Sequence, residues 1–346
     1  MVDVGNSDWI DSGDFYETYE RYKKEIDAEI GRISLISGRS AKQYDPLYKP
    51  VAHILQTKGK MLRPFLTLLS CEAVGGRPRA VLKGAASIEV AHMASLVHDD
   101  IMDESDVRRG VASVHKEFGR HEALLVGDFL IFNAYVGTLM LADTLPLERV
   151  VEGLRNLTNR ASEIVTGQYF EYQMRGKLDL SLEHYMQIIT LKTGKQFNGA
   201  CQVGSILGGG SREMTEKLGA YGESLGIAFQ IKDDILSVAG TTETILKPPE
   251  TDLTSRLVTL PVILALSKNK AEVTEAIARI YGRKQLLPHD HSELQKILKD
   301  CGAIDESMEV CRDHAKKALS YASELPSSGA KELLMGISVF VVERGT

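Results

Sequence analysis

The stretch Val97-His98-Asp99-Asp100-Ile101-Met102-Asp103 decides how this chain folds. It carries three aspartates inside a segment that otherwise has the apolar character of a buried helix. A buried carboxylate is costly unless it is paired with a charge or bound to a metal ion. Two such charges about 4 Å apart repel each other by about 4 kcal/mol at an effective dielectric constant of about 20. The stretch therefore predicts a helix end whose aspartates share cations.

A second aspartate pair, Asp233-Asp234, lies far downstream in another apolar, helix-like segment. Residues three or four positions apart share one face of a helix, so Asp99 and Asp103 point the same way, and so do Gln230 and Asp233. Magnesium prefers about six oxygen ligands and keeps several waters. Two facing clusters therefore predict several magnesium ions with a polyanion such as diphosphate held on them.

Basic side chains accompany the two aspartate motifs. Lys60 and Arg63 stand at a predicted helix start, where backbone amides also favour anions. Arg108 and Arg109 follow the first motif, and the arginine fork binds phosphate in bidentate fashion. Lys192 begins a Lys-Thr-Gly segment that interrupts a long predicted helix. Together these groups outline a pocket for two diphosphates.

The composition limits the class of protein. The 346 residues are 43% hydrophobic and 25% charged, which is ordinary for a globular protein. The net charge of −6 argues against broad nucleic-acid binding. No Cys-x-x-Cys pair occurs, so we expect no zinc site and no disulfide framework. This fits a reduced, cytoplasmic setting.

Nearly all of the chain reads as helical. Residues 1–13 are polar, lack the pattern of a signal peptide, and are expected to be flexible. No run of about 18 apolar residues occurs, so we expect no transmembrane helix, although peripheral membrane contact stays open. Residues 14–346 are expected to form a single all-helical domain. Helices are predicted over residues 14–35, 51–57, 64–74, 78–106, 121–142, 146–174, 181–207, 213–239, 257–267, 270–281, 291–300, 304–323 and 328–344.

Two loops bear on the site. The polar segment from Gly240 to Arg256, which contains Lys247, directly follows the second aspartate pair and is predicted to be a lid. The triplet His289-Asp290-His291 follows a proline, and we expect no third metal-binding partner near it, so we interpret it as a solvent-exposed loop.

These motifs, in this order, resemble the trans-isoprenyl diphosphate synthases, or polyprenyl synthetases, of the medium- and long-chain type. The resemblance covers about residues 45–345. The motifs that carry it are Gly59-Lys60 with Arg63-Pro64, Ser95-Leu96-Val97-His98 before the first aspartates, Arg108-Arg109-Gly110, Gly127-Asp128-Phe129-Leu130, Lys192-Thr193-Gly194, Phe229-Gln230 with Asp233-Asp234, and Thr259-Leu260-Pro261.

The resemblance implies a fold and a set of ligands. The fold is an isoprenoid-synthase-type helical bundle around a deep central cavity, usually found as a homodimer. The metal set is about three Mg²⁺ ions, with Mn²⁺ as a possible substitute. Its implied ligands are Asp99, Asp100, Asp103, Asp233 and Asp234, with Asp99 and Asp103 on two ions and Asp233 on the third.

The resemblance also implies two substrate subsites and a reaction. Isopentenyl diphosphate would condense head to tail with an allylic diphosphate to give an all-trans polyprenyl diphosphate. Lys192, Thr193 and Gln230 would stabilise the allylic carbocation, and the departed diphosphate would take the proton that is lost. The allylic subsite would be formed by Arg108, Lys192, Gln230 and Lys247, and the isopentenyl subsite by Lys60, Arg63, His92 and Arg109.

The chain departs from the family pattern at two places. Ser237 stands where the second motif usually has a third aspartate. Arg256 and Leu257 stand where a Gly-Lys pair often precedes the Thr-Leu-Pro segment. We expect weakened magnesium affinity and retained activity, with Arg256 replacing the missing cation.

Product length should depend on the side chains one to two helical turns before Asp99, because an isoprene unit adds about 5 Å and a helical turn rises about 5.4 Å. Small residues, Ala94 and Ser95, occupy this gate. An open gate predicts a product longer than geranylgeranyl diphosphate, of hexaprenyl or heptaprenyl type. Candidates for the deeper floor are Phe132, Tyr135 and Met140.

Other interpretations stay open at the level of sequence. A deeper floor would give a geranylgeranyl or geranylfarnesyl product. A noncatalytic regulatory subunit of a prenyl synthase would only shape the cavity of a partner. A terpene cyclase or a squalene-synthase-like enzyme would share the aspartate-rich helix, but the isopentenyl subsite argues against both.

Overall fold

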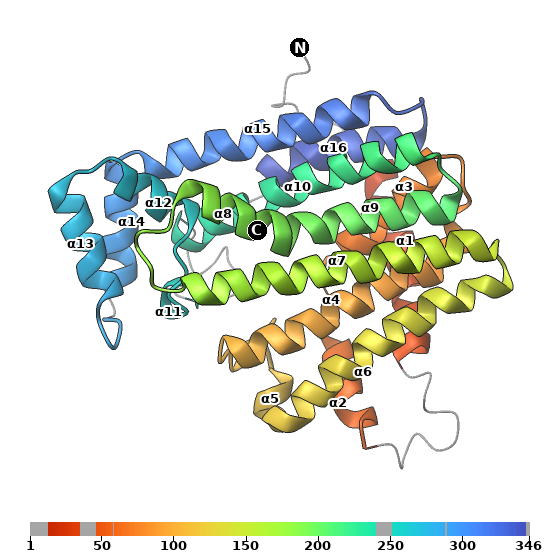
Figure 1. The fold of residues 1–346 in the computed structure, drawn as a ribbon, viewed down its shortest axis with the longest axis horizontal. Helices are drawn as coiled ribbons and strands as arrows, with labels where there is room; N and C mark the ends of the chain where they lie inside the picture. The colour runs from red at the N-terminus through yellow and green to blue at the C-terminus, as the bar shows by residue number, and fades with distance from the viewer. Residues whose placement is uncertain (1–12, 35–45, 58, 240–250, 288, 344–346) are drawn as a thin grey trace.

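A computed structural model describes residues 13–34, 46–57, 59–239, 251–287 and 289–343 (Figure 1). These residues form an all-helical protein, which confirms the predicted class, and one two-stranded hairpin is the only sheet among them. The elements are α1 (Gly13–Ser34), α2 (Tyr48–Gln56), α3 (Leu62–Ala73), η1 (Pro78–Val81), α4 (Leu82–Met102), β1 (Val107–Arg108), β2 (Val111–Ala112), α5 (Val114–Glu117), α6 (Arg120–Leu139), η2 (Met140–Asp143), α7 (Leu147–Met174), α8 (Leu182–Ile189), η3 (Thr190–Gly194), α9 (Lys195–Gly208), α10 (Arg212–Ala239), α11 (Thr251–Thr254), α12 (Leu260–Ser267), α13 (Ala271–Tyr281), α14 (Asp290–Asp300), α15 (Ala303–Ser323) and α16 (Gly329–Glu343).

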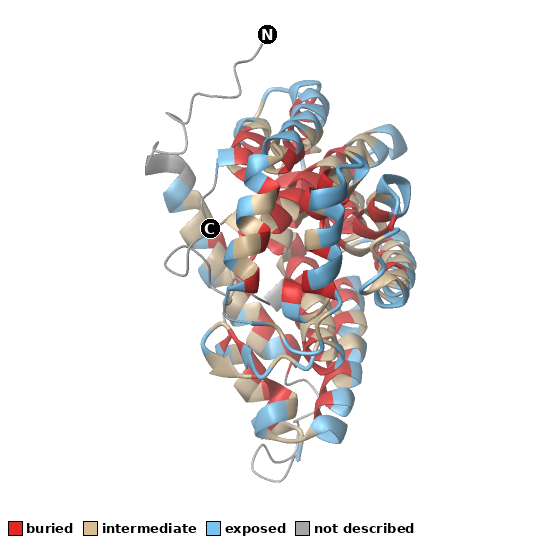
Figure 2. Cartoon of the chain, turned by 90° about the vertical axis from the view of Figure 1, so that its left-hand side faces the viewer, coloured by how far each residue is buried: buried red, intermediate tan, exposed pale blue. Residues whose placement is uncertain are grey.

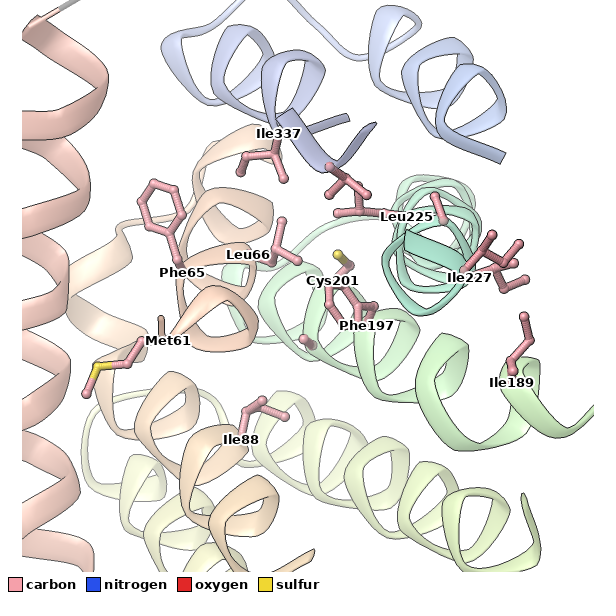
Figure 3. Close-up of a cluster of buried hydrophobic side chains, with 14 of the residues drawn as sticks. Met61, Phe65, Leu66, Ile88, Ile189, Phe197, Cys201, Leu225, Ile227 and Ile337 are labelled. Carbon is pink, nitrogen blue, oxygen red and sulfur yellow. The ribbon is translucent and has the colours of Figure 1, made fainter. Parts of the chain in front are cut away.

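The long helices lie side by side, and α13 and α14 gather at one end (Figure 1). Helix α4 packs against α1, α3 and α6, while α9 packs against α3, α7 and α10. Buried residues concentrate between the helices and exposed ones lie on their outer faces (Figure 2). Aliphatic and aromatic side chains from several helices fill the space between them, among them Phe65, Ile88 and Phe197 (Figure 3). The first aspartate motif ends α4 and therefore lies at one end of this packed core.

The first motif ends its helix earlier than the sequence predicts. Helix α4 stops at Met102, and Glu104 adopts a left-handed backbone with φ of 53°. The chain then returns through β1 and β2, whose two-residue loop is Arg109-Gly110. Both loop residues have positive φ, as a type I′ hairpin turn requires. A hairpin, and not a continued helix to residue 106, therefore places the two arginines.

The predicted interruption of the long helix at Lys192 is confirmed. Residues Thr190–Gly194 form a π-helical segment between α8 and α9. The backbone of α7 comes close at Gly167, where an added Cβ would lie 2.7 Å from the amide nitrogen of Lys192. Single π-helical turns inside α-helices are frequent at functional sites, because they redirect side chains and backbone groups.

One candidate for the cavity floor was wrong. The Phe132 side chain is 65% exposed on the outer face of α6, so it cannot close a cavity inside this chain. Tyr135 and Met140 are partly buried.

By length and composition alone, two helical segments could cross a membrane: Pro78–Met102 and Arg120–Asp143. Within the fold, 61% of the first apolar window is buried, as in the core helix of a globular protein, and 44% of the second.

The contact between α3 and α9 supplies a test of the packing. A Cβ added at Gly204 would lie 2.1 Å from the carbonyl oxygen of Thr67, so two backbones would have to separate. We expect Gly204→Ala to lower the free energy of unfolding by about 2 kcal/mol or more. Gly31 in α1 has nothing within 4 Å of its added Cβ. The control Gly31→Ala should raise stability by roughly 0.5–1 kcal/mol. Denaturant unfolding that ranks these variants in the opposite order would contradict the packing.

Candidate active site

The first aspartate motif presents two carboxylates to one side. Asp99 and Asp103 lie one turn apart at the end of α4, and both are partly exposed. Burial raises the pKa of Asp99, and the nearby carboxylates of Asp103 and Glu171 raise it further, while Lys192 opposes the shift. Like charges at short range repel, so this group of carboxylates favours cations beside it.

The middle aspartate of the motif faces another way. Asp100 is buried and accepts bonds from the Arg108 guanidinium, at 2.8 Å from Nε to each oxygen and 2.5 Å from Nη2 to Oδ1. Both side chains are almost fully enclosed. The expected role of Asp100 as a metal ligand thus competes with a buried ion pair, and breaking a buried pair typically costs several kcal/mol. Arg108 was expected to bind the allylic diphosphate. Its Nε and Nη2 groups are already engaged by Asp100.

Helix α7 contributes two charged groups that the sequence reasoning missed. Glu171 forms an ion pair with Lys192, with 2.6 Å between Oε1 and Nζ. Arg175, just beyond the end of α7, pairs with the carboxylate of Asp103 and donates to the carbonyl oxygen of Met102 at 3.2 Å. Burial alone would lower the pKa of Lys192, but the carboxylates of Glu171 and Asp99 outweigh it and raise that pKa. The spacing of Glu171 and Arg175, one turn apart on one helix face, was a signal available in the sequence.

A chain of hydrogen bonds joins the π-helical segment to the second motif. The Thr193 hydroxyl donates to Oε1 of Gln230 at 2.8 Å, and Nε2 of Gln230 donates to Asp234 at 2.8 Å. Asp234 also accepts from the Tyr185 hydroxyl at 2.7 Å and from the backbone amide of Leu260 at 3.4 Å. Asp234 is buried and has three donors, so its carboxylate fixes the orientation of the Gln230 amide.

The other aspartate of the second motif is more open. Asp233 is partly exposed and lies close enough to Arg63 to influence the pKa of that residue. One turn later, the Ser237 hydroxyl donates to the backbone carbonyl of Asp234 at 2.9 Å. A serine satisfied by its own helix adds no carboxylate oxygen to the site, so Asp233 is the partly exposed acid of this motif.

A basic wall stands beside the aspartates. Burial lowers the pKa of Arg63 to about 10, and this side chain lies over the ring of Phe197 at 4.8 Å. Burial, together with the charges of Arg63 and Arg109, lowers the pKa of His92 well below its ordinary value, so His92 is neutral at pH 7. Glu89 is buried nearby, where burial raises its pKa and the two arginines lower it. This wall has the charge that an anion subsite needs.

The predicted lid is only partly described. Lys247 lies outside the described residues, as does the rest of residues 240–250. The Arg256 guanidinium is used within the fold and not at the site. It donates to the carbonyl oxygens of Ile280 at 3.3 Å, Tyr281 at 2.9 Å and Arg283. These carbonyls lie at or just beyond the C-terminal end of α13. An arginine that bonds the last carbonyls of a helix stabilises that end. The expectation that Arg256 replaces the missing cation was therefore wrong.

The histidine triplet does not form an exposed loop as a whole. Asp290 is fully buried at the start of α14, where its side chain accepts from the backbone amide of Leu287 at 2.6 Å and lies 3.5 Å from Nε of Arg283. A ring nitrogen of His291 lies 3.0 Å from the carbonyl oxygen of Ser237. Only His289 is exposed, as expected. The expectation that no third partner lies nearby was wrong, because ligand atoms of His289, Asp290 and Glu293 lie within 4.8 Å of one another. The triplet ties α14 to the end of α10.

The gate residues lie on the motif helix. Ala94 is fully buried, and Ser95 is partly exposed and donates to the carbonyl oxygen of His92 at 2.8 Å. Neither side chain is large.

The donor set fits hard divalent cations. Asp99, Asp103 and Asp233 all offer partly exposed carboxylate oxygens, which magnesium prefers over nitrogen or sulfur ligands. Burial is the main cause of the raised pKa of Asp99, and the nearby cations Lys192 and Arg108 only partly offset it.

The comparisons with known proteins agree with this geometry. The family model described as "Polyprenyl synthetase" matches residues 44–301. A short chain isoprenyl diphosphate synthase of Methanothermobacter thermautotrophicus is 35% identical over 302 residues, which cover 87% of this chain and 91% of the relative.

Solved structures show the same likeness. Geranylgeranyl pyrophosphate synthetase from Pyrococcus horikoshii superposes with a TM-score of 0.87 at 33% identity, covering 96% of this chain and 99% of that one. A polyprenyl synthase from Caulobacter crescentus, complexed with calcium and isoprenyl diphosphate, gives a TM-score of 0.85 at 28% identity, covering 94% and 97%. Motifs, fold and family match together show that this chain belongs to the polyprenyl synthetase family of trans-prenyltransferases.

Proposed function

We propose that this enzyme condenses isopentenyl diphosphate with allylic diphosphates, in a magnesium-dependent reaction, to give an all-trans polyprenyl diphosphate. The observation that carries the proposal is the pairing of two different walls. One wall holds the partly exposed acids Asp99, Asp103 and Asp233, and the other holds Arg63 and the neutral His92. A metal-bound diphosphate suits the first wall, and a diphosphate held by cations suits the second.

The metal assignment distinguishes the members of each aspartate pair. Asp99, Asp103 and Asp233 would hold about three magnesium ions. Asp100 and Asp234 would instead position Arg108 and Gln230, because both carboxylates are buried and already accept hydrogen bonds from these side chains. Bound magnesium would supply charge stabilisation to the departing diphosphate. The Caulobacter polyprenyl synthase is complexed with calcium and isoprenyl diphosphate, which supports a divalent metal here.

The chain's own residues would then handle the allylic cation. The Thr193 and Gln230 oxygens lie beside the π-helical segment, and a hydrogen bond fixes their mutual orientation. Preorganised dipoles stabilise a developing charge better than mobile water does. Lys192 stays protonated, because its pKa is raised. Its ammonium group would then bind the allylic diphosphate in addition to Glu171. Loss of the final proton to the departed diphosphate needs no dedicated protein base.

The proposed reaction has a direct test. Purified protein, labelled isopentenyl diphosphate and each of the dimethylallyl, geranyl, farnesyl and geranylgeranyl diphosphates would be incubated with and without magnesium. Incorporation should require both the primer and the metal. No incorporation with any primer would contradict the proposal and favour a noncatalytic subunit that needs a partner.

A substitution at Asp99 separates activity from stability. Asp99→Asn should lower kcat by about 100-fold or more, because it removes a metal ligand. The folded-state pKa of Asp99 is raised, so its ionised form destabilises the metal-free protein at pH 7, and stability increases as pH falls through that pKa. In magnesium-free buffer the variant should therefore have an equal or higher Tm. Asp313→Asn, at an exposed position within α15, is the control and should change neither quantity. A large loss of Tm in Asp99→Asn would contradict the assignment.

We propose a product longer than geranylgeranyl diphosphate, on the basis of the small gate. Relatives that resemble the chain to a similar degree are named for short chain, geranylgeranyl and polyprenyl products, so likeness alone does not choose among them. A geranylgeranyl or geranylfarnesyl product is the alternative that a deeper floor would impose.

The gate has its own test. Ala94→Phe should shorten the product by one or more isoprene units, because an aromatic ring at this position would obstruct a tail that runs along α4. Ser95→Ala keeps the gate small and should leave the product distribution unchanged. Product chromatography after dephosphorylation would report chain length, and circular dichroism would establish that the variant is folded. Unchanged product length in a folded Ala94→Phe protein would remove the gate from this position.

We also propose a cytoplasmic homodimer that uses the outer faces of α6 and α7. Large apolar side chains are exposed on both helices, and soluble monomers rarely show contiguous apolar patches of this kind. They are Leu124, Leu125, Phe132, Val136 and Leu139 on α6, and Leu147, Val151, Val165, Tyr169 and Tyr172 on α7.

A charge within this surface tests the dimer. Phe132→Glu should yield monomers in analytical ultracentrifugation, because a carboxylate would be desolvated at the centre of the interface. Leu287 is 41% exposed at another part of the molecule, and Leu287→Glu should leave the dimer intact. An unchanged sedimentation coefficient for Phe132→Glu would place the interface elsewhere.

A further inference from the structure

The N-terminal helix α1 contacts the turn that carries Lys60. The Tyr19 hydroxyl donates a hydrogen bond to the backbone carbonyl oxygen of Lys60. The Lys60 side chain itself is exposed beyond that backbone contact. No sequence motif of the family lies in α1, and the reaction described above uses no residue of this helix. The contact with Lys60 links α1 to the substrate-binding residues.

The turn needs external support. Met61 has a φ of 47°, a left-handed backbone that a non-glycine residue adopts at some cost, and such conformations persist where the surroundings enforce them. Arg109 donates from Nη1 to the carbonyl oxygen of Thr57 at 2.8 Å. The same guanidinium packs closely on Gly59, because a Cβ added at Gly59 would lie 2.7 Å from Nη1 of Arg109. Arg109 therefore contacts Thr57 and Gly59, and Tyr19 contacts Lys60.

Tyr19 is itself well anchored. Its ring packs edge-on against Phe65 at 5.3 Å between centroids. Along the same face of α1, the buried side chains of Tyr22, Ile26 and Ile30 fasten the helix to the core. Figure 3 shows Met61 and Phe65 directed from the start of α3 towards the helix at the left edge, which is α1. The helix would stay in place without the Tyr19 hydroxyl.

The hydroxyl is a dependable donor. Burial raises the pKa of Tyr19 to about 12, and the nearby carboxylates of Glu20 and Glu89 add to the shift. Tyr19 is therefore protonated throughout the physiological range. Its hydrogen bond fixes the backbone at Lys60. Because α3 begins two residues later, the same bond also affects the position of Arg63 on the basic wall.

We propose that Tyr19 is a positioning residue for the isopentenyl diphosphate subsite. Its hydrogen bond to the Lys60 carbonyl sets the turn from which Lys60 projects and α3 begins, and so sets the spacing of Lys60 and Arg63. The inference rests on the proposed function, because it takes this wall as the isopentenyl side. It is specific to one substrate, since the contacts of Tyr19 lie on the basic wall and the allylic groups lie on α7, η3 and α10.

The test is Tyr19→Phe, which keeps the ring and removes only the hydroxyl. The KM for isopentenyl diphosphate should rise roughly three- to tenfold, as expected for one lost hydrogen bond that orders a binding group. The KM for the allylic diphosphate should stay within about twofold, because its subsite is untouched. Tyr16 is 66% exposed on the same helix, and Tyr16→Phe is the matched control with no expected change.

Calorimetry separates this inference from the proposed function. Wild-type protein should bind isopentenyl diphosphate, and Tyr19→Phe should bind it more weakly by a similar factor. Absence of binding and turnover in the wild type would defeat the proposed function and the inference with it. Normal wild-type behaviour with equal increases in both KM values, or with no change in either, would overturn the role of Tyr19 alone.

Discussion

The buried ion pair between Asp100 and Arg108 is the interaction on which the rest of the site depends. It withdraws one carboxylate from a crowded acidic helix end and pairs it in a dry environment, where an unpaired partner would be strongly destabilising. It also draws the hairpin onto the end of α4. Arg109 then donates a hydrogen bond to the carbonyl oxygen of Thr57. One pair thus connects the proposed metal-binding wall to the basic wall.

Each aspartate motif divides its work between neighbouring residues. Successive helical residues point about 100° apart, so two adjacent aspartates cannot face the same metal equally. In both motifs the second aspartate is buried among donors and the first is partly exposed. We infer that the buried members preorganise Arg108 and Gln230, and we assign the partly exposed members to cations. The organisation costs folding energy in the absence of metal, as the raised pKa of Asp99 indicates.

Much of this architecture could be predicted from the sequence. The bounds of α7 and α10, which lack internal prolines, lie close to the predicted ones. The break at Lys192 was visible because a Lys-Thr-Gly segment falls within an apolar helical pattern. The end of α4 was misplaced, since the hairpin that follows is held by the Asp100–Arg108 pair, a tertiary contact. Arg256 was misassigned for a similar reason: composition reveals a cation, but only packing shows that its partners are carbonyls.

The division of labour between neighbouring aspartates makes a direct claim about which of them bind metal. A crystal structure with Mn²⁺ and inorganic diphosphate, in which anomalous scattering locates the metals, would test it. We predict metal positions at about 2.1–2.2 Å from oxygens of Asp99, Asp103 and Asp233, close to the magnesium distance. Asp100 should remain on Arg108 and Asp234 on Tyr185. A metal coordinated by Asp100 or Asp234, with its present partner displaced, would contradict the division of labour within the two motifs.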